Sequence, residues 1–433
     1  ALTHDVAYGS VLLDRRREMH HTIGRAIEEL YADRLAEFYE TLAHHFGQAE
    51  DWERALLYHE RAAAKAAESF ANRAVIAHCQ AALAITAQLG ERIADERRRD
   101  LEEHLGLAHF YVSEFVTSGD AFVRAAEHRG DPGRRALALA NASFSHFWGH
   151  AYDVSARSVD ALRELGRREG LPLADALAAG AEGFAVGVCQ GDIATHQRLV
   201  DEALRTAEKV GDEAVVATLR FYLAQSAEWT GDYRRSMALS EQVIVAGRRL
   251  RLAHLVVWPG WFLGKAACCV GDYGRAIAQL TEAAEVCDRI GDRAWKSRLL
   301  NTLGWCHAEI GGHERSRELN RRAAAMAHEI GDPEIIANSE INLAVDALGL
   351  GDAEAARGYL DPIRAGLEQP GDPWMRWRYS LHAFDALGRS VPLILSVSVE
   401  AMGTLLGGQT MEALYASIEH FDLLAVGLNY ADH

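Results

Sequence analysis

Glycine recurs at a fixed spacing of 40 residues through the second half of this 433-residue chain. A second series of Gly-Asp pairs lies 20 residues out of phase, and it is interrupted where Leu171 and Arg251 stand. Glycine readily adopts the left-handed conformation that closes a helix, and an aspartate after it can cap the next helix. The two series therefore predict two helices in every 40 residues. The first series is Gly191, Gly231, Gly271, Gly311 and Gly351, and the second is Gly130, Gly211, Gly291, Gly331 and Gly371.

Small side chains occupy the position seven residues before the glycines of the first series, where two helices of a pair would have to approach closely. These residues are Ala224, Gly264, Gly304 and Ala344. Between the breaks the apolar residues follow a helical spacing, as Trp295, Leu299 and Leu303 do. A register kept over several units is the signature of a repeat array that grows by stacking. We therefore predict an all-α solenoid of helical hairpins with a repeat of about 40 residues, most regular between Gly130 and Gly388.

One unit resembles the tetratricopeptide repeat. Leu263-Gly264, followed by Gly271-Asp272-Tyr273-Gly274-Arg275-Ala276, is similar to its Leu-Gly and Gly-x-Tyr-x-x-Ala elements. The period differs from the usual one of about 34 residues. The resemblance covers residues 40–388, and it implies a tetratricopeptide-like scaffold that binds proteins or peptides.

The N-terminal segment resembles a junction found in bacterial signalling proteins. The residues that carry this resemblance are Ala1–Tyr8, Arg15–His20 and Ile23–Tyr31. They are similar to the segment where an ATPase module meets tetratricopeptide repeats in class III adenylate cyclases. The resemblance implies that residues 1–39 are a helical junction from an upstream ATPase-type module, and that the repeats are regulatory or sensory. No phosphate-binding loop follows from the sequence, since Gly260–Ala266 lacks the required Ser or Thr.

The last segment, residues 389–433, differs from the repeats in its composition and in its residue pattern. No lysine or arginine follows Arg389, and β-branched and leucine residues alternate with others over 391–399. A helical pattern over 411–421 and a second strand pattern over 423–426 follow. We predict a short β-α-β fragment here.

This tail resembles part of the homocysteine-binding domain of cobalamin-dependent methionine synthases. The matching segments are Pro392–Glu400, Gly403–Thr410 and Gly427–Asn429. In that family a zinc-binding cysteine follows the last segment, but this chain has Tyr430 there. A barrel also needs about 250 residues. The alternative function, a zinc-dependent homocysteine methyltransferase, is therefore inactive in this chain, and the tail is either a fused fragment with its seam near 388–391 or a native cap of the solenoid.

The composition of the chain limits the classes of partner that it can bind. A formal charge of −17 argues against a nucleic-acid or anionic membrane surface. The six cysteines show no C-x-x-C pair and fit a reducing compartment, so we expect a cytoplasmic protein. The apolar runs over 252–264 and 391–399 are shorter than the roughly 20 residues of a membrane span. We expect no metal, no cofactor and no catalytic residues; the oligomeric state stays open.

The first helices of tetratricopeptide repeats line a concave groove, which implies groove positions 13, 10, 6 and 3 residues before each turn glycine. In the middle of the array these positions collect aromatic and cationic side chains, as binding hot spots do. An equally open interpretation of each tryptophan is that it fills the core. We expect a protein or peptide partner, with an acidic peptide as the hypothesis, and Pro259 either kinks its helix or marks that helix's first turn. The predicted groove residues are Phe221, Gln225, Trp258, Trp261, Lys265, Arg298, Asn301 and Trp305.

Overall fold

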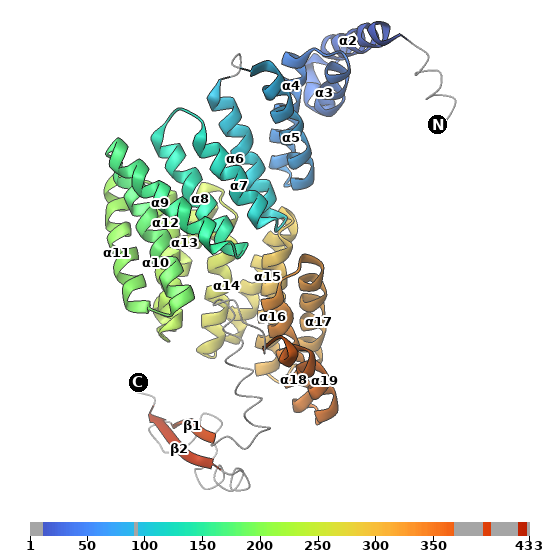
Figure 1. Ribbon diagram of the computed structural model, residues 1–433. Helices are drawn as coiled ribbons and strands as arrows, with labels where there is room; N and C mark the ends of the chain where they lie inside the picture. Colours follow the sequence, from blue (N-terminus) through green and yellow to red (C-terminus); the bar gives the residue numbers. More distant parts are fainter. Residues whose placement is uncertain (1–11, 91–93, 368–392, 400–422, 431–433) are drawn as a thin grey trace. The chain divides into compact units, whose positions relative to one another are not determined.

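The computed structural model describes residues 12–90, 94–367, 393–399 and 423–430. The described helices up to residue 363 belong to one compact unit, and the two strands belong to another. Figure 1 follows the helices in pairs from α4 in blue to α19 in brown. The first unit begins with α2 (Leu13–Leu30), η1 (Ala32–Phe38), α3 (Tyr39–Gln48), α4 (Trp52–Glu68), α5 (Asn72–Leu89), α6 (Asp95–Tyr111) and α7 (Phe115–Glu127).

The remaining helices form two layers. Every second helix of this part of the chain contacts the next helix of the same set, so these helices stack into what we call the inner layer. The outer helices alternate with them along the chain, and each outer helix packs against its neighbours in sequence. The inner-layer helices are α8 (Pro132–Trp148), α10 (Pro172–Ala185), α12 (Glu213–Trp229), α14 (His254–Cys269), α16 (Arg293–Glu309) and α18 (Pro333–Gly349). The outer helices are α9 (Tyr152–Glu169), α11 (Ile193–Val210), α13 (Tyr233–Leu250), α15 (Tyr273–Ile290), α17 (His313–Ile330) and α19 (Ala353–Leu367). A short π-helix, η3 (Val186–Gln190), follows α10.

The helix breaks lie where the glycine series predicts them. The described glycines of both series have positive φ, and the aspartates that follow accept backbone hydrogen bonds as N-caps. Asp272, for example, accepts from the backbone N–H of Arg275 at 3.2 Å. The interruptions of the second series have a local explanation: Gly170 takes the left-handed position beside Leu171, and Arg251 adopts it itself at φ 57°.

Replacing Arg251 with glycine is expected to raise the free energy of unfolding by about 1 kcal/mol, because a side chain with Cβ is strained in the left-handed region. Arg251 is exposed, so the change removes no packing. Urea unfolding followed by circular dichroism measures the effect. Arg249→Gly, two residues earlier within α13, should have the opposite sign, because glycine destabilises a right-handed helix by about 1 kcal/mol. Equal losses in both variants would contradict the explanation.

The predicted close approach of paired helices is confirmed at two positions. A Cβ on Gly264 would lie 2.4 Å from Cγ of Leu280 on α15, and one on Gly304 would lie 2.3 Å from Nδ2 of Asn320 on α17. Contacts this short do not occur between real side chains. Glycine therefore lets each inner helix rest directly against its outer partner.

Contacts between residues far apart in sequence close the array on itself. The Asn72 side chain at the start of α5 donates to the backbone oxygen of Ile290 at the end of α15, at 2.7 Å. The Trp258 ring on α14 stacks on Phe144 of α8, with centroids 4.8 Å apart, and approaches Phe110 of α6 at 5.8 Å. Helices α6 and α8 of the early repeats thus share one aromatic core with α14.

One described segment, Pro172–Gln190, is long and apolar enough to span a membrane by length and composition. It is not one of the apolar runs noted in the sequence, 252–264 and 391–399. Half of the segment is buried inside the repeat array, where α10 packs against α8, α9, α11 and α12. Its hydrophobicity is therefore accounted for by its place in the inner layer.

The second unit contains two described strands, β1 (Leu393–Val399) and β2 (Leu423–Tyr430). They pair in parallel, with Val397 opposite Leu428 and Val399 opposite Tyr430. Parallel neighbours need a crossover connection. The helix predicted over 411–421 and the seam predicted over 388–391 lie outside the described residues, so the complete β-α-β fragment stays a prediction.

Candidate binding sites on the inner layer

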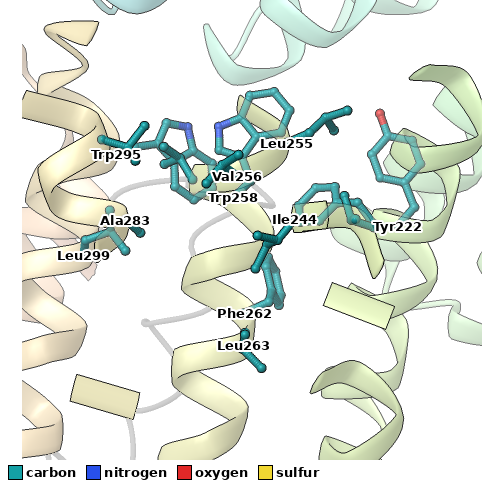
Figure 2. Close-up of a cluster of buried hydrophobic side chains, with 14 of the residues drawn as sticks. Tyr222, Ile244, Leu255, Val256, Trp258, Phe262, Leu263, Ala283, Trp295 and Leu299 are labelled. Atoms are coloured by element: carbon teal, nitrogen blue, oxygen red, sulfur yellow. The ribbon is translucent and has the colours of Figure 1, made fainter. Parts of the chain in front are cut away.

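The predicted groove residues all lie on inner-layer helices, but several are buried. Phe221 on α12 and Trp258 on α14 are only 3% and 5% exposed. Their ring centroids are 5.9 Å apart. Figure 2 shows the indole of Trp258 beside that of Trp295 on α16, at a centroid distance of 5.7 Å. The core interpretation therefore holds for Trp258, because the rings of Phe144 and Trp295 cover it instead of water. Phe221 is buried as well, against Trp258 and Phe262, which corrects its placement in an open groove.

The structure corrects the prediction that Arg298 is free to contact an acidic partner. Arg298 is 5% exposed, and its guanidinium binds two carboxylates of the next repeat, Asp332 at 3.0 Å and Glu334 at 2.8 Å. It also lies over the rings of Trp148 at 5.3 Å and Trp295 at 5.7 Å. A buried cation needs such partners, because its desolvation must be offset. Arg298 therefore connects α16 with α18 and α8.

Asn301 and Gln225 are likewise buried, which corrects their placement in an open groove. The Asn301 amide donates to Oδ1 of Asn320 at 3.0 Å, and Asn320 also accepts from the Asn342 amide at 3.1 Å. This chain of amides joins α16, α17 and α18 and satisfies polar groups that would otherwise be unpaired in the core. Asn301 thus has a structural role within the repeats.

Three predicted residues keep partial solvent access, and we call them the inner patch: Trp261, Lys265 and Trp305. The Lys265 ammonium lies 5.3 Å from the Trp261 ring centroid and pairs with Glu228 at 2.8 Å. The Trp305 indole donates to Glu309 at 2.9 Å. The patch therefore presents aromatic faces and a lysine that is already paired, so it lacks the two free cations that favoured an acidic partner.

Pro259 lies inside α14, five residues after its first residue, so it does not mark the first turn. Beside it, two adjoining cavities open between the inner-layer helices, with volumes of about 350 and 310 Å³. They share lining residues from α8, from the α13–α14 connection and from the start of α14: Leu137, Asn141, Phe144, Leu252, His254 and Trp258. The sequence did not predict the cavities, because among the six shared lining residues only Trp258 stands at a predicted groove position and the others form no motif.

His254 is the titratable side chain that both cavities share. Burial lowers the pKa of its imidazole from 6.5 to about 4, so it is neutral near pH 7. The unfolded chain takes up a proton at this residue as pH falls below 6.5, whereas the folded chain does so only near pH 4. The stability tied to His254 is thus complete above pH 6.5 and is lost as pH falls toward 4.

We expect His254→Gln to reduce the loss of stability on acidification. Wild type and variant should both be unfolded in urea at about pH 7 and about pH 5, on either side of the ordinary histidine pKa. The wild type should lose more free energy of unfolding between the two than the variant does. Identical losses would show that His254 takes up no extra proton on unfolding in this range. The comparison separates the contribution of His254 from that of Asp292. Burial raises the pKa of Asp292 to about 7, so its effect on the pH dependence of stability has the opposite sign.

Among the described residues, no group of three His, Cys, Asp or Glu side chains is placed to hold a metal ion. Histidines from different helices do meet, and Nδ1 of His20 lies 2.8 Å from Nδ1 of His45. This pair joins α2 to α3.

Comparisons with known proteins agree with the repeat fold. The tetratricopeptide repeat family matches residues 260–329, which span α14 to α17. The chain therefore contains a tetratricopeptide repeat region. A search of curated protein sequences gives no match.

Several solved structures are similar to the chain at low identity. BtubC from P. vanneervenii is 21% identical, with a TM-score of 0.42 over 50% of this chain and 92% of that one. A Rap protein complexed with competence and sporulation factor is 13% identical, with a TM-score of 0.44 over 86% and 99% of the two chains. A signal transduction ATPase with numerous domains and a tetratricopeptide repeat sensor, from Pyrococcus horikoshii, is 10% identical, with a TM-score of 0.45 over 86% and 54%.

Proposed function

We propose that this chain is a non-enzymatic interaction scaffold that binds a protein or peptide on its inner layer. The observation that carries the proposal is the inner patch. Trp261, Lys265 and Trp305 keep solvent access on stacked helices where most other large apolar side chains are buried. Partly exposed tryptophans beside a cation are typical of protein-binding hot spots.

The resemblance of residues 1–39 to the ATPase–repeat junction of class III adenylate cyclases supports a more specific proposal. The repeats are the regulatory or sensory region of a cytoplasmic bacterial signalling protein, and the ATPase-type module lies upstream. Extending the reading frame at its 5′ end tests this part: cyclase and ATPase motifs should precede residue 1, and their absence there would contradict it.

For the tail, the parallel pairing of β1 and β2 favours the second proposal, a fragment related to the homocysteine-binding domain of methionine synthase. This is a proposal about origin and not about activity, because Tyr430 replaces the zinc-binding cysteine of that family.

Affinity capture with the full chain tests the scaffold proposal. Trp305→Ala removes a partly exposed ring from the inner patch, and Val245→Ala removes an apolar side chain that is 63% exposed on the outer helix α13. Loss of one aromatic hot spot should weaken binding of a captured partner by about 2 kcal/mol or more, whereas the control should change it little. Both variants should keep the wild-type circular dichroism. Unchanged capture by Trp305→Ala, or equal loss in Val245→Ala, would place the binding surface elsewhere.

A further inference from the structure

The two adjoining cavities share six lining residues and are bounded by helices from separate repeats. The first is lined by α6, α7, α8 and the start of α14, and the second by α8, α9, α10, α12 and α14. Their volumes of about 350 and 310 Å³ are within the range of small-molecule sites. A molecule there would contact four or five inner-layer and neighbouring helices at once.

The lining is apolar and carries no net charge. None of the described residues that line the second cavity is Asp, Glu, Lys or Arg. Arg134 and Glu103 line the first cavity, but they form an ion pair with each other, and Arg134 also binds Asp100 at 2.7 Å. A charged ligand would lose its hydration without a free counter-ion, which is strongly unfavourable.

Most polar groups in the lining already have protein partners. Ser143 Oγ lies 3.0 Å from Ser155 Oγ, and the Thr218 hydroxyl donates to the backbone oxygen of Ala214 at 2.9 Å. Trp258 differs. Its side chain lines both cavities and is buried, yet its indole Nε1 has no hydrogen-bond partner among the described residues. A buried donor without an acceptor is unfavourable, and a ligand oxygen can supply the acceptor.

We propose that these cavities bind one small, uncharged, mainly apolar molecule that carries a hydrogen-bond acceptor for Nε1 of Trp258. The aromatic faces of Phe144 and Trp258, stacked 4.8 Å apart, provide the apolar contact surface. The neutral imidazole of His254, whose ring centroid is 4.9 Å from that of Trp258, adds a polar group without charge. This site goes beyond the proposed protein partner, since it takes a small molecule and uses none of the inner patch.

The uncharged fluorescent ketone Prodan provides a direct probe, because its emission shifts to the blue in an apolar site and its carbonyl is an acceptor. Titrated against the full chain, it should bind saturably at about one molecule per chain. Asn141→Trp places a bulky ring where both cavities share an exposed residue, and it should abolish the saturable signal. Val245→Trp adds the same ring to the outer helix α13 and should bind as the wild type does.

A second pair of measurements tests the role of the indole N–H. Trp258→Phe keeps an aromatic ring but removes Nε1, so Prodan should bind about 3- to 10-fold more weakly, as loss of one hydrogen bond predicts. Dimethylaminonaphthalene, which lacks the ketone, should bind the wild type and Trp258→Phe equally. Thr218→Phe fills the second cavity from α12 and provides an independent blocking variant.

Undiminished Prodan binding in both Asn141→Trp and Thr218→Phe would overturn the proposal, as would the lack of a saturable blue shift in the wild type. Variants that retain the wild-type circular dichroism are compared; if one blocking variant does not fold, the other decides. The protein-partner proposal is tested on Trp305 and does not depend on this outcome. Prodan binding that fails while Trp305→Ala still abolishes partner capture would remove only the small-molecule site.

Discussion

Arg298→Ala is expected to lower the free energy of unfolding of the repeat unit by about 3–5 kcal/mol, the range found when one partner of a buried ion pair is removed. The side chain is 5% exposed and holds Asp332 and Glu334. Without it, both carboxylates stay partly buried beside each other and lose their counter-ion. The cation also leaves the ring faces of Trp148 and Trp295.

The matched control for Arg298 lies on the same helix. Arg293 pairs with Glu329 of α17, and both side chains are more than half exposed. An exposed ion pair contributes about 0–1 kcal/mol, so Arg293→Ala should shift the urea midpoint only slightly. The two variants are compared by circular dichroism during urea unfolding. Similar shifts in both would mean that Arg298 does not hold α8, α16 and α18 together.

Gly264→Val should lower the free energy of unfolding by about 1–3 kcal/mol through overpacking. The added Cβ would lie 2.4 Å from Cγ and 2.7 Å from Cδ2 of Leu280, a side chain that is fully buried between α14 and α15. Since Leu280 is fully buried and cannot turn out into solvent, we expect the two helices to separate. Urea unfolding again measures the loss, and near-ultraviolet circular dichroism reports on the nearby tryptophans.

Gly274→Ala is the control for a glycine that has no packing role. Gly274 lies in the first turn of α15, and an added Cβ would meet nothing within 4 Å. Its stability should be unchanged or slightly raised, because alanine is the better helix former. A loss at Gly274 equal to that at Gly264 would contradict the account, because it would mean that the loss does not depend on the α14–α15 contact.

The sequence predicted the features that depend on neighbouring residues. Each helix end needs a left-handed residue and a cap, and both are local properties that Gly-Asp pairs reveal. The close approach at Gly264 and Gly304 was also predictable, because a small side chain recurs seven residues before the turn glycine in four of the five units of the first series. Arg251 could not be assigned this way, since an arginine in the left-handed region gives no sequence signal of its own.

The closure of the inner layer could not be predicted. Whether a groove position faces solvent depends on the curvature of the array, which accumulates over several repeats and brings Asn72 next to Ile290. A periodic pattern shows that Trp258 and Trp305 occupy groove positions. It cannot show that Phe144 covers Trp258, whereas Trp305 stays partly exposed. The same curvature creates the cavities at Asn141 and His254. Only three of the eight predicted groove residues are therefore accessible.

The measurement that tests the central claim most directly is site-specific photo-crosslinking in cells. A benzophenone amino acid is placed at Trp305 in the inner patch or at Val245 on the outer helix α13, and both full chains are expressed at equal levels. The scaffold account predicts a discrete crosslinked protein product from position 305 and none from position 245. A product from position 245 with none from position 305 would contradict the claim that the inner layer binds the partner.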